Sequence, residues 1–414
     1  MKNKYYLSPI DDITPNPLNP REHPEEQQAQ LAKCMSEVGF TQPVLIDENR
    51  VVLAGNGRLL AARKLGLTEV PVIAIEHLTD TQKRLYLIAD NQLALNSNWD
   101  EQKLQAAVSE LERDLADLDL TGLRPQEIDR ILADLAPEEG ATDEDEIPEV
   151  PSLVTTRPGD LWNLAGKHWV LSGDATDATS YERLLKGEPA DMVFCDLPYN
   201  CSYKQKRRTG PVRTIINDNL GTGFADFLHS VCIQLLSVTR GALYICMSSA
   251  ELHTLHKAFT EAGGHWSTFV IWNKDRFTLG RSDMQRQYEP ILYGWKEGQE
   301  HYWCGARNES DVWCVPKPKA NRLHPTCKPV SLVERAIRNS SRRGDRVLDA
   351  CGGSGSTLIA CEKSGRRGYL MELDPKYIDV TVKRWEAYAQ QEATLEGDGR
   401  TFTAIAAERC RLAA

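Results

Sequence analysis

The sequence predicts an α/β protein, with a mostly parallel β-sheet in its C-terminal two thirds and a small α+β domain in front of it. After residue 155, short apolar runs alternate with helical patterns, as is typical of a parallel sheet covered on both faces. Before residue 137, hairpin-like strands and amphipathic helices follow one another instead. The 414 residues exceed the size at which one core usually keeps growing, so several domains are expected.

Residues 1–97 are expected to form the small α+β domain. Its predicted elements are a helix, two hairpin strands, a second helix and a further strand, at Glu25 to Val38, Pro43 to Ile46, Val51 to Ala54, Gly57 to Leu65 and Val70 to Ile75. Three amphipathic helices should follow at Thr79 to Leu95, Asp100 to Leu115 and Pro125 to Leu135, the last two within a helical extension over residues 98–136.

The net charge of −10 by itself argues against a nucleic-acid partner, because phosphate contacts need Lys and Arg. Much of the excess negative charge lies in one stretch, residues 137–149, which is rich in Asp and Glu. Such a run is typical of a solvated, self-repelling segment. We therefore expect an acidic linker over residues 137–155, with nearly balanced charge elsewhere.

The main domain is expected over residues 156–390, followed by a tail, 391–414, in which no chemistry is identified. Its predicted strands are Trp169 to Ser172, Met192 to Cys195, Ala242 to Met247, Phe269 to Trp272, Ile291 to Trp295, Arg346 to Ala350 and Gly368 to Glu372.

The chain is expected to be cytoplasmic. No apolar stretch approaches the roughly 20 residues of a membrane span, and Met1 to Tyr6 lacks the apolar core of a secretory signal. The 11 cysteines are scattered without a C-x-x-C or a metal-site spacing, which favours free thiols and no metal.

A Gly/Ser-rich turn follows the predicted strand that ends at Asp349, and a helix leaves this turn at Ser356. Glycines there let backbone amides approach a ligand at a helix N-terminus. The next strand ends in an acid, Glu372, about 20 residues later, where nucleotide-type α/β folds bind a ribose hydroxyl. The alternative is a tight strand-to-helix connection with an ordinary surface Glu.

Four stretches together carry a resemblance to a known family. They are Asp196-Leu197-Pro198-Tyr199, His324-Pro325-Thr326-Cys327-Lys328-Pro329, Val347-Leu348-Asp349-Ala350-Cys351-Gly352-Gly353-Ser354-Gly355-Ser356-Thr357 and Glu372-Leu373-Asp374-Pro375-Lys376-Tyr377. In this order they resemble permuted DNA adenine-N6 or cytosine-N4 methyltransferases, in which the catalytic half precedes the cofactor half. The departures are Leu197 for a proline and Ala350-Cys351 for Pro-Phe.

The resemblance implies a Rossmann-like fold and S-adenosylmethionine as cofactor. It places Asp349, Gly353 and Gly355 at the methionine portion, in a turn that also contains Ser354 and Ser356. It further places Glu372 at the ribose, Asp174 at the adenine side and Lys328 at the carboxylate end of the cofactor.

The residues of the Asp196 motif suit an amino-methylation. An exocyclic amine of a base is a poor nucleophile, so it needs acceptors that hold its N–H groups and direct its lone pair at the methyl group. We assign these roles to the Asp196 carboxylate and the Leu197 carbonyl, with Pro198 shaping the turn and Tyr199 stacking on a base that has left the duplex. Alone, the tetrapeptide is equally typical of a strand-end turn with a surface Tyr. Family members with Asp at the first position mostly act on adenine N6; cytosine N4 is the alternative.

Double-stranded DNA is the expected partner. The loop Ser202 to Arg213 holds a set of cations that could clamp phosphates, Lys204, Lys206, Arg207, Arg208 and Arg213. The alternative is a solvated charged face. The region from Trp272 through Glu289 to Trp313 resembles the family's catalytic-domain end and target-recognition region, although we favour a core position for Trp295, Trp303 and Trp313.

Ile10 to Asn91 resembles a ParB-like domain, related in fold to sulfiredoxin. The motifs are Asn19-Pro20-Arg21, Gly39 followed by Pro43-Val44, Gly55-Asn56-Gly57-Arg58 and Ala89-Asp90-Asn91. They imply an anion site at Arg21, Gly55 and Arg58, beside a helix start that suits a phosphate. We prefer a DNA- or nucleotide-binding accessory role over hydrolysis, with a homodimer as a further option. A DNA-binding adaptor whose second half no longer turns over is the alternative from another class.

Overall fold

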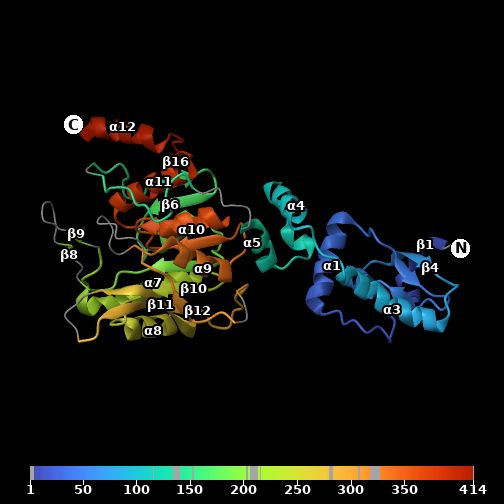
Figure 1. Cartoon of the computed structure of the whole chain (residues 1–414). Helices are drawn as coiled ribbons and strands as arrows, with labels where there is room; N and C mark the ends of the chain where they lie inside the picture. Colours follow the sequence, from blue (N-terminus) through green and yellow to red (C-terminus); the bar gives the residue numbers. More distant parts are fainter. Residues whose placement is uncertain are drawn as a thin grey trace. The chain divides into compact units, whose positions relative to one another are not determined.

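The computed structural model describes residues 4–114, 116–133, 140–151, 153–201, 204–205, 213–214, 216–278, 283–305, 308–317 and 327–413. The chain divides into an N-terminal unit, residues 1–135, and a C-terminal unit, residues 136–414 (Figure 1). Among the described helices, we find none with the length and apolarity that crossing a membrane requires.

The N-terminal unit contains a four-stranded sheet of β1 (Lys4–Pro9), β2 (Val44–Ile46), β3 (Val52–Ala54) and β4 (Glu69–Ala74), in the order β1-β4-β2-β3. Strands β2 and β4 run parallel, and the two outer pairs are antiparallel. Helices α1 (Glu25–Val38) and α2 (Asn56–Lys64) complete the fold. The predicted helices and strands are confirmed here; β1 was missed because alternate residues such as Tyr5 and Leu7 are exposed.

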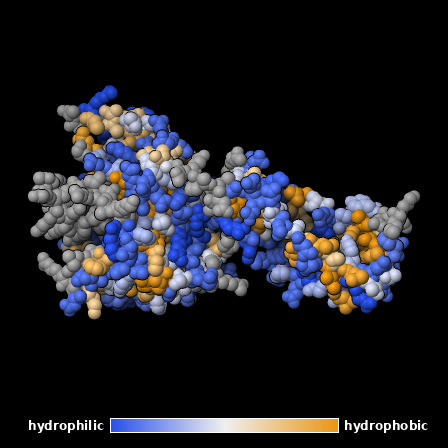
Figure 2. Space-filling model, viewed as in Figure 1, coloured by the Kyte–Doolittle hydropathy of each residue, from blue (hydrophilic) through white to orange (hydrophobic). Residues whose placement is uncertain are grey.

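Three further helices are confirmed at α3 (Asp80–Leu95), α4 (Glu101–Arg113) and α5 (Pro125–Ala133). Thr79 and Gln82 form a capping box that starts α3. Helices α4 and α5 share a small core of their own, which includes Val108 and Ile131. Helix α3 leaves several apolar side chains exposed, and Figure 2 shows apolar side chains gathered on the N-terminal unit; those on α3 are Leu85, Ile88, Leu93 and Leu95.

The C-terminal unit is built on a ten-stranded sheet, ordered β13-β11-β12-β10-β7-β14-β15-β6-β5-β16. The five central strands run parallel, and antiparallel pairs flank them on both sides. The strands are β5 (Leu161–Leu164), β6 (His168–Ser172), β7 (Met192–Asp196), β10 (Leu243–Cys246), β11 (Gly264–Thr278), β12 (Arg286–Lys296), β13 (Val312–Cys314), β14 (Arg346–Asp349), β15 (Arg367–Glu372) and β16 (Ala393–Leu395). A short hairpin, β8 (Lys204–Gln205) and β9 (Arg213–Thr214), lies outside this sheet.

Two layers of helices cover the sheet. Helices α6 (Ala178–Leu185), α7 (Phe224–Val238) and α8 (Leu252–Glu261) share one hydrophobic cluster, which includes Val193 of β7. Helices α9 (Val330–Ser340), α10 (Ser356–Ser364) and α11 (Pro375–Ala389) share the other cluster, which includes Phe194. Adjacent residues of β7 therefore face opposite layers, as the pleat of a doubly covered strand requires.

The sheet contains a topological switch between β7 and β14. From β7 the chain passes through α7 to β10, whereas from β14 it passes through α10 to β15, and these helices lie in opposite layers. The connections that follow the two neighbouring strands therefore diverge, which leaves a crevice at their carboxyl ends. Open α/β sheets bind their ligands at this position.

Two segments differ from the expectation. The acidic stretch was expected to be a solvated linker, but residues 140–151 pack on the C-terminal unit, where Ile147 is buried and Glu144 pairs with Lys363. The partner of Glu144 lies far along the chain, so composition alone does not reveal this packing. The expected tail, residues 391–414, forms β16 and α12 (Phe402–Ala413), whose Phe402 packs on Trp162.

Candidate active site

The two predicted motifs meet at the topological switch of the C-terminal unit. Asp196 is the last residue of β7 and Asp349 is the last residue of β14. The strands are parallel neighbours, with Val347 paired to Met192 and Leu348 to Val193. Because parallel strands end at the same edge, the two carboxylates lie in one crevice.

The Asp196 carboxylate is held from both sides. The Tyr199 hydroxyl donates to Oδ1 at 2.8 Å, and the Lys328 ammonium donates to Oδ2 at 2.7 Å. Lys328 also donates to the Tyr199 hydroxyl at 2.9 Å. The structure thus joins Lys328 to the predicted catalytic residues, although the resemblance implied a place at the cofactor carboxylate.

Two residues that we did not assign to the site complete this network. The Glu289 carboxylate on β12 pairs with Lys328 at 3.2 Å and is a second acceptor, at 3.2 Å, for the one hydrogen of the Tyr199 hydroxyl. Lys274 on β11 forms an ion pair with the other Glu289 oxygen. Lys328 and Lys274 are both only 6 % exposed, so each cation depends on its carboxylates for compensation. The hairpin of β11 and β12 brings Lys274 and Glu289 together, a pairing that no short motif signals.

The charged groups of this network shift one another's pKa values. Burial raises the pKa of Glu289, but Lys328 and Lys274 outweigh it and lower the pKa to about 2. Burial lowers the pKa of Lys328, but Asp196 and Glu289 outweigh it and raise the pKa above its usual value. Burial and both carboxylates raise the pKa of the Tyr199 hydroxyl well above its usual value. The network therefore contains two anions, two cations and a neutral phenol.

The turn after β7 is fixed by side chains. Asp218, which is 2 % exposed, accepts from the amides of Tyr199 at 2.9 Å and Cys201 at 3.3 Å. Asn200 has a positive φ of 55° and accepts from the amide of Leu220 at 3.0 Å. The side chain of Leu197 is buried in the core, so this departure from the family pattern serves packing.

The turn after β14 is tied to the acid at the end of β15. The Gly353 amide donates to Glu372 Oε2, and the Asp374 amide donates to Oε1, each at 2.9 Å. Each carboxylate oxygen keeps a second lone pair for a ligand hydroxyl. Burial raises the pKa of Glu372.

Asp349 lies beneath this turn and is 3 % exposed. Its oxygens accept from Thr357 Oγ1 at 2.6 Å and from the Cys351 amide at 3.1 Å. Burial raises the pKa of Asp349 to about 7, against the effect of these hydrogen bonds.

The turn after β14 needs glycine at two positions, for different reasons. Gly353 has φ +51° and Gly355 has φ +83°, a region that residues with a Cβ rarely adopt. A Cβ on Gly355 would lie 2.9 Å from the side chain of Thr381 on α11, whereas a Cβ on Gly353 would meet no atom closer than 3.9 Å. The back of the turn is therefore packed on α11, and its front is open to a ligand.

Further predicted residues lie around these two turns. Ser356 Oγ donates to the carbonyl of Lys328 at 2.8 Å, which links the turn after β14 to the network around Asp196. Asp174, in the loop after β6, accepts from Thr176, and the Gly173 amide of that loop donates to the carbonyl of Glu372 at 3.1 Å. Cys327 contacts the Ser354 hydroxyl at 3.4 Å. All predicted cofactor residues thus belong to one end of the sheet.

The predicted DNA-contacting loop lies partly outside the described residues. Lys204 and Arg213 belong to the hairpin of β8 and β9, whereas Lys206, Arg207 and Arg208 lie outside the described ranges. The same holds for His324-Pro325-Thr326. Of the three tryptophans for which we favoured the core, Trp313 is buried, Trp295 is half-buried and Trp303 is 38 % exposed.

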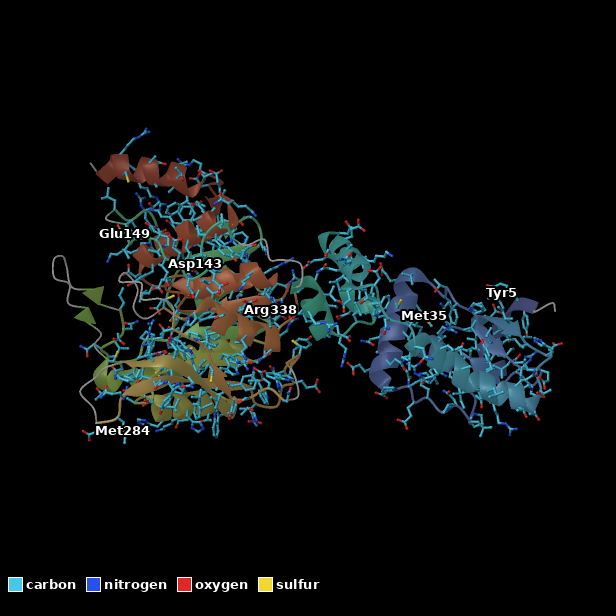
Figure 3. All side chains as sticks on the ribbon, in the orientation of Figure 1. Tyr5, Met35, Asp143, Glu149, Met284 and Arg338 are labelled. Carbon is cyan, nitrogen blue, oxygen red and sulfur yellow. The ribbon has the colours of Figure 1, made fainter. Side chains whose placement is uncertain are left out.

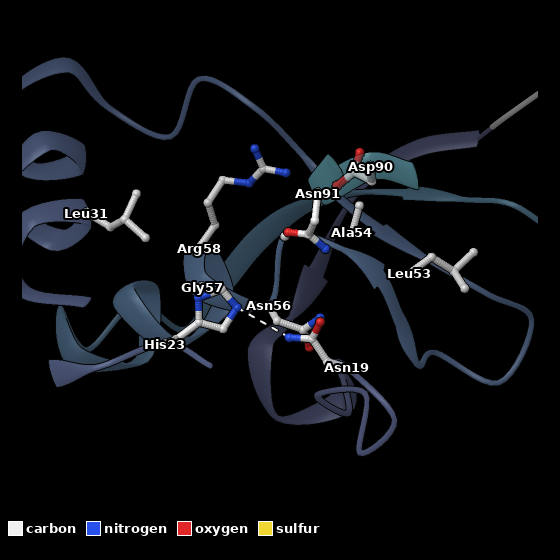
Figure 4. A pocket seen from close by; sticks show the side chains of 11 residues that line it. Asn19, His23, Leu31, Leu53, Ala54, Asn56, Gly57, Arg58, Asp90 and Asn91 are labelled. Atoms are coloured by element: carbon white, nitrogen blue, oxygen red, sulfur yellow. Dashed lines mark hydrogen bonds between the residues drawn. The ribbon is translucent and has the colours of Figure 1, made fainter. Parts of the chain in front are cut away.

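The N-terminal unit contains a hollow of about 160 Å³ at the start of α2 (Figure 4). Gly55, with φ +98°, precedes the helix, and Arg58 lies over it. The Arg58 guanidinium donates to Gln42 and to the Pro43 carbonyl, while its Nε is buried without a hydrogen-bond partner among the described residues. Burial lowers the pKa of Arg58. Arg21, by contrast, is outside the hollow's lining and donates to Asn91 at 3.1 Å.

Three family models match the chain. A DNA methylase model of the N6/N4 type matches residues 190–383, a ParB N-terminal domain model matches residues 2–91, and a ParB-methyltransferase HTH domain model matches residues 102–158. The chain belongs to the N6/N4 DNA methyltransferase family and carries an N-terminal ParB-like domain. The matched ranges contain Asp196, Glu289, Lys328, Asp349 and Glu372.

The curated relatives fall into the same two groups. The ParB-like nuclease domain-containing protein YnaK of Escherichia coli is 43 % identical over 20 % of this chain and 95 % of its own length. The type II methyltransferase M.BglI of Bacillus subtilis is 26 % identical over 36 % of this chain, which spans about half (47 %) of that relative. The DNA adenine methyltransferase YhdJ of Escherichia coli is 25 % identical over 52 % of this chain and 83 % of its own length.

Solved structures are similar as well. The cytosine-N4-specific PvuII DNA methyltransferase aligns with 64 % of this chain and 96 % of its own, at 16 % identity and a TM-score of 0.42. The M1.HpyAVI–SAM complex aligns with 52 % of this chain and 97 % of its own, at 19 % identity and a TM-score of 0.41.

Proposed function

We propose that the C-terminal unit transfers a methyl group from S-adenosylmethionine to the N6 amine of adenine in DNA. The observation that carries this proposal is the meeting of Asp196 and Asp349 at the carboxyl ends of β7 and β14, where the sheet diverges. One carboxylate belongs to a network suited to a base amine, and the other lies under a Gly-rich turn suited to a nucleotide-like cofactor.

The residues of the second turn fit S-adenosylmethionine. Glu372 is oriented by two main-chain amides and offers free lone pairs to the two ribose hydroxyls. The turn presents an open side at Gly353, and Asp349 supplies a carboxyl group for the cationic methionine end. Asp174 and Glu372 add negative charge near a cofactor whose sulfonium and ammonium are positive. The cofactor supplies the methyl group as an electrophile.

The chain's own residues would prepare the amine. Asp196 and the Leu197 carbonyl accept its two N–H groups, so that the nitrogen lone pair is directed at the methyl carbon. S-adenosylmethionine held at the second turn would supply the methyl group, and Asp196 or water would take the proton that the amine gives up. Lys328 and Tyr199 hold the Asp196 carboxylate in one orientation, which reduces the reorganisation that the reaction needs.

The choice of adenine rests on Asp196 at the first position of its motif, by the resemblance of the sequence. Similar proteins include both an adenine methyltransferase, YhdJ, and a cytosine-N4-specific one, so cytosine N4 is the alternative. Incubating the purified chain with unmethylated DNA and S-adenosylmethionine, followed by nucleoside mass spectrometry, decides between them. N6-methyl-2′-deoxyadenosine is the expected product. N4-methyl-2′-deoxycytidine alone would show that the base is wrong, and the absence of both products would favour the adaptor.

S-adenosylmethionine affinity is expected to fall as the pH decreases. The pKa of Asp349 is raised to about 7, mainly by burial, and only its ionised form attracts the ammonium of the cofactor. Protonation below this pKa therefore competes with binding, by roughly tenfold between about pH 8 and about pH 6. Calorimetric titrations at both values test this. Asp349→Asn, which does not titrate, should bind weakly at both, and equal affinity of the unmodified protein at both pH values would contradict the role of Asp349.

DNA binding is expected to depend on the basic loop 204–213. Replacing Lys206, Arg207 and Arg208 by glutamine removes up to three phosphate contacts, so affinity should fall and its salt dependence should flatten. Fluorescence anisotropy with a labelled duplex at several salt concentrations measures the slope. The same number of Lys→Gln changes at Lys103, Lys257 and Lys376 is a control. An unchanged slope for the loop variant would make this loop an ordinary solvated face.

For the N-terminal unit we propose an accessory role in binding DNA or a nucleotide. The supporting observation is the hollow at the start of α2, where helix amides and the partly unpartnered Arg58 suit a phosphate. Calorimetry with nucleoside triphosphates tests it, with Arg58→Ala as the variant that should lose binding. Nucleotide binding that survives this change would place the anion elsewhere.

A homodimer is a further proposal, which sedimentation of the purified chain can test.

A further inference from the structure

An acidic segment near the start of the C-terminal unit contacts two sides of the proposed cofactor site, which are the turn after β14, reached through Arg384, and the start of α9. We call residues 140–147 the strap. Figure 3 labels Asp143, which begins a turn in the strap: the Asp143 side chain accepts from the Asp145 amide at 2.9 Å, and its carbonyl accepts from the Glu146 amide at 3.0 Å. The Ala141 amide donates to the carbonyl of Tyr388 on α11 at 3.0 Å. The strap is therefore folded onto the C-terminal unit.

The first wall is the turn after β14. Arg384 of α11, which is 2 % exposed, donates one nitrogen to the Ser354 carbonyl at 2.8 Å and the other to the Glu144 carbonyl at 2.6 Å. A guanidinium is planar and its donors have fixed directions, so it sets the separation of the two carbonyls. Its Nε is buried without a partner among the described residues, so the terminal nitrogens compensate its burial, with a further contact to Ser356 Oγ at 3.4 Å.

The second wall is the start of α9. The Asp145 carboxylate accepts from the amide of Val330, the first residue of α9, at 3.0 Å. A carboxylate at a helix N-terminus is stabilised by the free amides and the helix dipole. Val330 lies two residues after Lys328, whose ammonium is bound to Asp196. The main chain of this segment also bonds the turn after β14, because the Lys328 carbonyl accepts from Ser356 Oγ. Asp145 thus restrains the piece of main chain that the turn after β14 contacts.

A third contact joins the helices behind these walls. Lys363 of α10 pairs with Glu144 Oε2 at 2.6 Å and with Glu334 Oε2 of α9 at 2.9 Å. The Ser356 hydroxyl also bonds the Lys328 carbonyl, so the two walls are linked directly as well. One short piece of chain therefore reaches α9, α10 and α11, which together hold the cofactor turn and Lys328.

We propose that the strap sets the shape of the cofactor site, with Asp145 and Arg384 as positioning residues for S-adenosylmethionine binding. This inference rests on the proposed function. Asp145 bonds the main chain of Val330 and Arg384 bonds that of Ser354, so each would act on the cofactor through the main chain of another residue. The affinity for the cofactor therefore depends on a segment that connects the ParB-like unit to the catalytic unit.

The test measures cofactor affinity by calorimetry with S-adenosylmethionine on the full chain. Asp145→Ala and Arg384→Lys should each raise the dissociation constant by roughly tenfold, since each loses a charge-assisted hydrogen bond to the site's main chain. Methylation at saturating cofactor should proceed at nearly the unmodified rate, so that KM for the cofactor changes and kcat does not. Asp145→Asn keeps an acceptor oxygen for Val330 and should bind nearly as well as the unmodified chain.

Glu146→Gln is the matched control, because it removes one carboxylate charge from an exposed position of the strap and keeps the hydrogen bonds of Asp145 and Arg384. It should leave the cofactor affinity unchanged. Thermal unfolding of each variant without cofactor identifies a folding defect, and if Asp145→Ala unfolds, Arg384→Lys decides. Folded variants that bind as tightly as the unmodified chain would overturn this inference. An unmodified chain that binds no S-adenosylmethionine would instead overturn the proposed function, and the inference with it.

Discussion

Asp196→Ala is expected to abolish methyl transfer to DNA, with a loss of roughly 10³-fold or more, because a positioned carboxylate contributes this much to such steps. The cofactor affinity should stay nearly unchanged. Asp196 is bonded to Lys328 and Tyr199, and none of its hydrogen bonds among the described residues reaches the turn at Gly353. A radiolabelled methyl-transfer assay and a calorimetric titration, performed on the same preparation, measure the two quantities.

Asp196→Asn is the informative companion variant. It keeps one acceptor oxygen for the amine but loses the charge that faces Lys328, so its activity should lie between those of the unmodified chain and the alanine variant. A loss of cofactor binding equal to the loss of transfer would show that the two halves of the site are assigned the wrong way round.

Lys328→Met is expected to give the second large effect, a fall in kcat of roughly 10²- to 10³-fold, because it removes the cation that orients the catalytic carboxylate. Lys328 bonds Asp196, Tyr199 and Glu289, which occupies all three donors of its ammonium. Without the Lys328 ammonium, the negative charges of Asp196 and Glu289 lie beside the Tyr199 hydroxyl with less positive charge to compensate them. The free energy of unfolding should fall by about 3–5 kcal/mol, as for other broken buried ion pairs.

The same variant decides where Lys328 acts. The network predicts a nearly unchanged cofactor affinity, whereas contact with the cofactor carboxylate, which the resemblance implied, predicts a large loss. Lys167→Met breaks the ion pair with Glu362 outside the site and should leave kcat unchanged. Adding Glu289→Gln to Lys328→Met should restore part of the lost stability, since it removes one of the two carboxylates. A normal kcat for Lys328→Met would exclude a positioning role.

The elements and motifs that local patterns control were predictable. Helices α1 and α3 begin and end within a residue of the predicted bounds, because periodicity and caps are properties of neighbouring residues. The turn after Asp349 and the acid at Glu372 were also predictable, since glycine spacing and strand length set them locally.

Contacts between distant segments were not predictable in this way. Lys274 and Glu289 meet only because β11 and β12 form a hairpin, and their pair reaches Lys328 only because α9 begins beside β7. The acidic stretch illustrates the same limit. Its composition predicts a solvated linker, yet the Glu144 carboxylate pairs with Lys363 and the Glu144 carbonyl accepts from Arg384, both more than 200 positions away.

The sequence by itself therefore predicted the class of fold, the order of the two motifs and the candidate residues for the chemistry, because each is a local pattern of a few neighbouring residues. The tertiary structure alone decided which groups surround Asp196, where Lys328 is bound and where the acidic segment packs. The physical reason is that a buried charge is placed by its partners, and here those partners come from strands and helices far apart in the chain.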